Sequence, residues 1–119
     1  MRSIFIYIAV LFFSFSFSQK KELRQIKRLI EEKFFQEAES TLESNKDFLL
    51  SGDSKTDAQF YYYATKIYTE IKSFKQAKNS LEELMSINPS YYNAEMKLDY
   101  KNLEEILVVA LVNAAVADN

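Results

Sequence analysis

Carboxylates and hydroxyls are the main groups with which this chain could perform catalysis, because its 119 residues include no histidine and no cysteine. Their absence excludes Ser-His-Asp and Cys-His nucleophile systems and removes the commonest zinc ligands. Three pairs of adjacent glutamates remain: Glu31-Glu32, Glu82-Glu83 and Glu104-Glu105. Neighbouring helical residues point about 100° apart, so the two carboxylates of a pair do not converge on one substrate atom. We interpret these pairs as solvated helix surfaces and predict neither a catalytic residue nor a metal site.

Phosphate, cofactor and nucleic-acid binding also lack a motif in this sequence. The Ser-x-x-Lys spacing of Ser18 and Lys21 straddles a predicted cleavage site and is attributed to chance. Gly52 is the only glycine and cannot by itself form a phosphate-cradling loop. The pI is about 5.2 and both charge signs are scattered, whereas nucleic-acid binding calls for a basic face. We predict no cofactor and no nucleic-acid partner. An enzyme that cleaves envelope polysaccharide with a carboxylate such as Glu70 is an alternative function, but no motif in the sequence supports it.

The elements that position any site are predicted to be helices. Gly52 and Pro89 are the only glycine and proline, so the chain lacks the residues that tight β-turns require. Segments of alternating apolar and polar residues are missing as well, whereas Glu, Lys, Leu, Ala and Gln, which favour helices, are plentiful. The sequence therefore predicts an all-α fold.

The first 18 residues are predicted to be a signal peptide. Arg2 supplies a positive start, an apolar stretch of about 14 residues follows, and small residues at Ser16 and Ser18 suit a signal peptidase. The stretch is shorter than the roughly 20 residues of a spanning helix, so we expect cleavage after Ser18 and no stable membrane span; an uncleaved anchor is the alternative. The folded domain is then residues 19–119, in the periplasm or elsewhere in the cell envelope.

Apolar residues at helical spacing predict two helix hairpins in this domain. The first hairpin comprises a helix over Lys20–Lys33 and a second helix that continues to about residue 50. A turn at residues 51–54 and a capping box at Thr56–Gln59 are expected to begin the third helix. A corner at residues 72–74 leads to the fourth helix, which Asn88-Pro89 ends because proline lacks an amide proton.

The last third of the sequence predicts two further helical segments, Asn93–Tyr100 and Leu103–Ala117. From Ile106 to Ala117 only Asn113 is polar. A run of about 12 residues is too short to cross a bilayer, so a core helix covered on all sides is favoured over a helix that docks on lipid or on a partner.

Residues in the second hairpin resemble the tetratricopeptide repeat (TPR), a helix-turn-helix unit of about 34 residues. The resemblance covers Ala58–Tyr91 and depends on the spacing of Tyr61, Ala64, Thr65, Tyr68, Ala77, Leu81 and Pro89. Thr65 stands where the family usually has glycine, and Tyr61 where it usually has tryptophan. The resemblance implies that Ala64 and Ala77 allow close helix packing.

A weaker copy of the pattern precedes this unit. Leu29, Phe35, Ala38 and Leu42 each lie 39 positions before Tyr68, Phe74, Ala77 and Leu81. A third unit is expected to begin with Leu103–Asp118. The resemblance thus implies antiparallel helix hairpins stacked as a short TPR-like α-solenoid, and a missing second helix in the third unit predicts a domain truncated at its C-terminus.

The resemblance also implies a function, namely a scaffold that binds a protein or peptide in a groove lined by the first helices of successive units. Carried to this chain, the groove residues are Gln59, Tyr62, Tyr63, Lys66, Thr69 and Glu70. Arg24, Lys27 and Glu31 are expected to form an adjoining charged edge. Packing of Tyr62 and Tyr63 against neighbouring helices is the alternative for these two rings.

Three further readings follow from the same resemblance and from the apolar segment. In one alternative, the chain is the N-terminal repeat segment of a longer envelope protein, and the repeats position an enzyme or receptor in its later portion. Residues 103–117 are a candidate surface for self-association, and Ile106–Ala117 is a candidate for docking on lipid.

Overall fold

The computed structural model describes residues 18–50 and 52–117, and every regular element in this part of the chain is a helix. The elements are a helix over residues 18–31, α2 (Phe35–Ser44), α3 (Lys46–Leu49), α4 (Ser54–Glu70), α5 (Phe74–Ser86), the 3₁₀ helix η1 (Pro89–Tyr91), α6 (Ala94–Leu98) and α7 (Tyr100–Ala117). The prediction of an all-α fold is confirmed. The predicted signal peptide lies outside the described residues except for Ser18.

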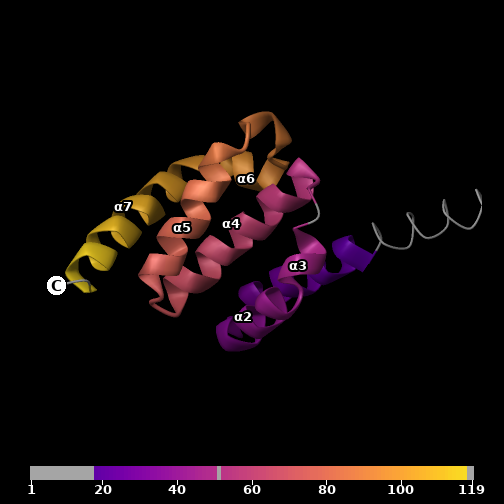
Figure 1. The fold of residues 1–119 in the computed structure, drawn as a ribbon, viewed down its shortest axis with the longest axis horizontal. Helices are drawn as coiled ribbons and strands as arrows, with labels where there is room; N and C mark the ends of the chain where they lie inside the picture. Colours follow the sequence, from indigo (N-terminus) through magenta and orange to yellow (C-terminus); the bar gives the residue numbers. More distant parts are fainter. Residues whose placement is uncertain (1–17, 51, 118–119) are drawn as a thin grey trace, which may run out of the picture.

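The helix α4 occupies the centre of the arrangement. It packs against α5 on one side and against α2 on the other, and α7 packs on the far side of α5 (Figure 1). The core between these helices is formed mainly by aliphatic and tyrosine side chains: Leu23, Ile26, Leu42, Leu49, Tyr62, Ile67, Leu81, Leu84, Met96 and Leu103. Helices distant in the sequence therefore share one apolar core.

The corner between the helix of residues 18–31 and α2 has the same geometry as the corner between α4 and α5. Lys33 (φ 65°) and Lys72 (φ 64°) both adopt the left-handed conformation, which usually favours glycine. In the first corner the Phe34 amide donates to the Leu29 carbonyl, and in the second the Ser73 amide donates to the Tyr68 carbonyl, each at 2.8 Å. Both helices thus end in the same hydrogen-bonded cap without a glycine.

The predicted second helix, expected to run unbroken to about residue 50, is divided at Asn45 into α2 and α3. The Asn45 side-chain amide donates to the Thr41 carbonyl at 2.8 Å. Asparagine side chains compete with the backbone for such carbonyls, which explains why the helix is interrupted here.

The predicted capping box at Thr56–Gln59 is wrong. The N-cap position is occupied by Asp53, three residues before Thr56, and α4 begins at Ser54. The Thr56 hydroxyl donates to the Asp53 carboxylate at 2.8 Å instead of accepting a backbone amide. Because Asp53 already precedes the first turn, Thr56 lies inside the helix and does not cap it.

The connection from α5 to α7 follows the predicted stop at Asn88-Pro89. The Asn88 side chain accepts the Ser90 amide at 3.0 Å, and Pro89 begins η1. Asn93 then caps α6 by accepting the Met96 amide at 2.9 Å. The expected helix in Asn93–Tyr100 is therefore present as α6, which Asp99 separates from α7.

The prediction that Leu103–Ala117 is a core helix covered on all sides is wrong. Leu103, Ala110 and Ala114 are buried, whereas Val108, Val112 and Val116 are 57–68% exposed. The helix packs on α5 with one side only, because no described element covers the other side. None of the described helices meets the length and apolarity that crossing a bilayer requires.

Candidate functional site

Two cavities follow one face of α4 and together form what we call the α4 groove. The first, the basic cavity, has a volume of about 510 Å³. It lies between the helix of residues 18–31, α4 and the start of α6. Its lining residues are Lys20, Leu23, Arg24, Lys27, Asp53, Lys55, Thr56, Gln59, Tyr63, Asn93 and Glu95.

The second cavity, the Asp99 cavity, has a volume of about 320 Å³ and lies one to two turns further along α4. Its lining residues are Ile30, Phe35, Lys66, Thr69, Glu70, Asp99, Asn102 and Ile106. Gln59, Tyr63, Lys66 and Glu70 are three or four positions apart, so they lie on one face of the helix. Both cavities are thus walled by α4, by the first hairpin and by the segment from Asn93 to Ile106.

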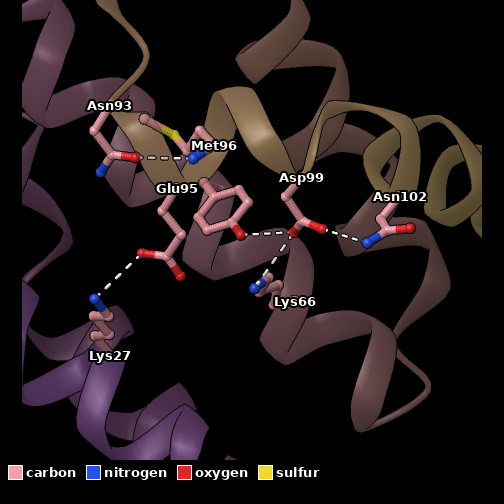
Figure 2. Close-up of polar contacts among 8 residues, drawn as sticks. Lys27, Lys66, Asn93, Glu95, Met96, Asp99 and Asn102 are labelled. Atoms are coloured by element: carbon pink, nitrogen blue, oxygen red, sulfur yellow. Dashed lines mark hydrogen bonds and ion pairs between the residues drawn. The ribbon is translucent and has the colours of Figure 1, made fainter.

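An ion pair crosses the groove between its outer walls. The Lys27 ammonium lies 3.3 Å from the Glu95 carboxylate, and both side chains are about 40% exposed (Figure 2). Lys27 comes from the helix of residues 18–31 and Glu95 from the first turn of α6. An exposed pair of this kind contributes only about 0.2–1 kcal/mol, so it can be exchanged for other contacts.

Asp99 is the most connected polar residue of the site. Its carboxylate accepts a hydrogen bond from the Tyr62 hydroxyl at 2.7 Å and one from the Asn102 side-chain amide at 2.6 Å (Figure 2). The Lys66 ammonium lies 3.5 Å from the same carboxylate and 4.5 Å from the centre of the Tyr62 ring. These contacts connect α4 to the junction of α6 and α7, and so hold two walls of the groove together.

The pKa of Asp99 is lower than the ordinary value of an aspartate. Burial by itself raises the pKa of this carboxyl. The hydrogen bonds from Tyr62 and Asn102, together with the Lys66 charge, favour the ionised form more strongly and set the net direction. Asp99 is therefore an anion at neutral pH and offers a fixed negative charge in its cavity.

Tyr62 and Tyr63 do not present open aromatic surface to the groove, which corrects the prediction for these two rings. Tyr62 is 1% exposed and Tyr63 is 5% exposed. Tyr62 packs in the core below Lys66, whereas Tyr63 lines the basic cavity with the small part of its surface that remains. Burial, together with nearby carboxylates, raises the pKa of both phenols, so both stay protonated.

The other predicted groove residues do line the groove. Gln59 lines the basic cavity, and Lys66, Thr69 and Glu70 line the Asp99 cavity. Of the predicted charged edge, Arg24 and Lys27 line the basic cavity and Glu31 does not. The structure thus brings most of the predicted residues to one groove, although it buries Tyr62 and Tyr63 almost completely.

Several residues of the groove were missed by sequence reasoning. Lys20 lies one helical turn before Arg24, so helical spacing alone was sufficient to find it. Glu95 and Asp99 carried no such signal, because their part in the groove depends on how α6 and α7 pack against α4. The Asn93 cap, which fixes the direction of α6, has the recognisable form of a side-chain acceptor three residues before its amide donor.

A separate cavity of about 400 Å³ lies between the α2–α3 segment, α4 and α5. Tyr61 and Tyr68 line it, and the Tyr68 hydroxyl donates to the Glu43 carboxylate at 3.0 Å. This contact joins the two hairpins on the side away from the residues predicted to bind a partner.

The groove offers hydrogen-bonding and charged side chains without a cluster of metal ligands. Within residues 18–50 and 52–117, no group of three or more Asp and Glu side chains could hold a metal ion. Comparisons with protein-family models, with curated proteins and with solved structures found no match for this chain.

Proposed function

We propose that this protein is a non-catalytic scaffold that binds a peptide segment of another protein in the α4 groove. The observation that carries the proposal is the groove, in which three segments distant in the sequence line two cavities along one helix face. Sites of this kind bind an elongated ligand, because contacts are spread along the length of a helix. Specificity comes from the polar and charged side chains of the walls.

The same proposal includes the finer architecture, in which the two hairpins are stacked as TPR-like units of a short α-solenoid. Matching corners at Lys33 and Lys72 support it. Ala38 and Ala77 are both fully buried at equivalent positions of the two hairpins, as are Leu42 and Leu81. In such a solenoid the first helices of successive units line one surface, which is where the groove lies.

The proposed location is the cell envelope, outside the cytosol. Residues 1–18 have the charge and apolar pattern of a signal peptide, and this pattern is the support for the location. The proposed partner is consequently an envelope or secreted protein.

The absence of histidine and cysteine from the sequence supports a binding role over a catalytic one.

A selection from a random-peptide phage library tests the proposal. Peptides selected on the purified protein should bind it in a fluorescence anisotropy assay. Gln59→Trp places a large ring in the basic cavity and should weaken this binding by about tenfold or more, equivalent to about 1.4 kcal/mol. Gln36→Trp is the matched control, because Gln36 is exposed on α2 and lines none of the cavities described above.

Helical circular dichroism melts of both variants would verify that each remains folded. Selection of no peptide, or of peptides that Gln59→Trp binds as well as the parent protein does, would contradict binding in the α4 groove. Equal losses in both tryptophan variants would also contradict it, because the effect would then not depend on the groove.

A further inference from the structure

We infer, on the basis of the proposed function, that the segment bound at the basic cavity is acidic and that Glu95 competes with it inside the protein. Four cationic side chains line this cavity, Lys20, Arg24, Lys27 and Lys55, whereas only two acidic side chains do, Asp53 and Glu95. The chain as a whole has the opposite balance, with 15 basic and 17 acidic residues. The basic cavity is thus a local concentration of positive charge on an acidic protein.

Most of this positive charge is available to a ligand. Lys20, Arg24 and Lys55 make no ion pair within residues 18–50 and 52–117. Of the two acidic residues, Asp53 accepts a hydrogen bond from the Thr56 hydroxyl, and Glu95 pairs with Lys27. A ligand carboxylate that enters the cavity therefore meets three cations that make no ion pair with another described residue.

Glu95 indicates the kind of group that the cavity binds. Its carboxylate reaches from α6 across the groove to Lys27, 3.3 Å away, and occupies the position that a ligand carboxylate would take on that wall (Figure 2). Because both side chains of the pair are about 40% exposed, the free energy needed to separate them is about that of an ordinary surface ion pair. An acidic side chain of a partner can therefore replace Glu95 on Lys27.

The Asp99 cavity carries more negative than positive charge, so the two ends of the groove favour different ligand residues and fix the orientation of the ligand. Lys66 is already paired with Asp99, and Glu70 adds a second negative charge. Ile30 and Ile106 supply apolar surface on the two walls. The complementary ligand therefore places carboxylates over the basic cavity and apolar or basic residues over the Asp99 cavity.

A pair of synthetic peptides tests this inference. The acidic probe is a short fluorescein-labelled peptide that repeats Glu-Leu-Glu-Ala, and its neutral counterpart has Gln in place of every Glu. The purified protein should bind the acidic probe more tightly, and added salt should weaken that binding because counter-ions screen partly exposed charges.

Charge variants test whether the acidic probe binds at the basic cavity. Arg24→Glu should weaken binding of the acidic probe by roughly five- to tenfold. Arg28→Glu, the same change on an exposed arginine of the same helix that does not line the basic cavity, should have much less effect. Glu95→Gln should tighten binding by roughly two- to fivefold, because it releases Lys27 to the ligand.

The outcomes separate this inference from the proposed function. Equal binding of the acidic and neutral probes, or equal losses in Arg24→Glu and Arg28→Glu, overturns the acidic preference and leaves peptide binding intact. Weaker binding by Glu95→Gln overturns the role of Glu95 as a competitor. If neither these probes nor any library peptide binds, both the inference and the proposed function are wrong.

Discussion

The helices α4 and α7 are similar in length but differ in how much of their surface is covered. In α4, flanked by α2 and α5, eight residues are buried, including three tyrosines. In α7, which packs mainly on α5, only Leu103, Ala110 and Ala114 are buried among residues 100–116. Yet α7 is the more apolar sequence, since a single polar residue interrupts Ile106–Ala117.

This difference shows that apolar composition does not decide which helix becomes the centre of a fold. The helix α4 can bury Tyr62 and Tyr68 because carboxylates of neighbouring segments accept hydrogen bonds from their hydroxyls, in the pairs Tyr62–Asp99 and Tyr68–Glu43. The valines of α7 need no such partners, but no described element lies against them.

The largest effect on stability is expected from shortening an aliphatic side chain at a similar position along each of the two helices. Ile67→Ala in α4, at a fully buried position, should lower the free energy of unfolding by about 2–5 kcal/mol because it leaves a cavity. Val112→Ala in α7, at a position 57% exposed, should change it by less than about 0.5 kcal/mol. Urea unfolding followed by circular dichroism measures both, and comparable losses would mean that the α7 face is covered in solution.

A smaller effect is expected from removing one hydroxyl that connects α4 to α7. Tyr62→Phe should cost about 1–2 kcal/mol, because Asp99 then loses its shortest contact with α4 while its burial is unchanged. Tyr91→Phe, at an exposed tyrosine, should cost close to nothing. In the Asp99→Asn background the Tyr62→Phe cost should shrink, and a cost that stays the same would show that the hydrogen bond is not the source of the stability.

The pH dependence of stability should report the same contact. The pKa of Asp99 is lower in the folded protein than its ordinary value of 3.8. Its stabilisation is therefore fully present above 3.8 and is lost as the pH falls below that value through the folded-state pKa. Asp57 acts in the opposite direction, because burial and the charge of Asp53 raise its pKa. Since Asp57 is present in both proteins, its effect cancels when the parent protein is compared with Asp99→Asn.

Urea unfolding between about pH 5 and pH 3 should therefore show a steeper loss of stability for the parent protein than for Asp99→Asn. Identical slopes would contradict the lowered pKa of Asp99.

The smallest effect on stability is expected from placing charge on the exposed face of α7. Val112→Lys should leave the unfolding free energy almost unchanged, but it should reduce any self-association through residues 103–117, because a lysine opposes contact between apolar faces. Sedimentation velocity over a range of protein concentrations measures this. If the parent protein associates and Val112→Lys associates equally, the α7 face is not the surface involved.

Local patterns in the sequence were sufficient to predict the helices and several of their boundaries. Helical spacing of apolar residues located α4, α5 and most of α7, and Pro89 marked the end of α5. The resemblance to the tetratricopeptide repeat, which itself depends on that spacing, implied the groove positions Gln59, Lys66, Thr69 and Glu70 of α4. These features depend on residues within a few positions of one another, and for that reason they can be read from a single sequence.

The tertiary structure alone decided which faces are buried and which residues meet across the groove. Periodicity fixes the angle between Tyr62, Tyr63 and Lys66 on a helix, but it does not say that Asp99 lies against Tyr62 or that Glu95 reaches Lys27. Nor does it say that α5 covers only one side of α7. Burial and charge pairing depend on contacts between segments dozens of residues apart, and the free energy of those contacts is not contained in the local pattern of either segment.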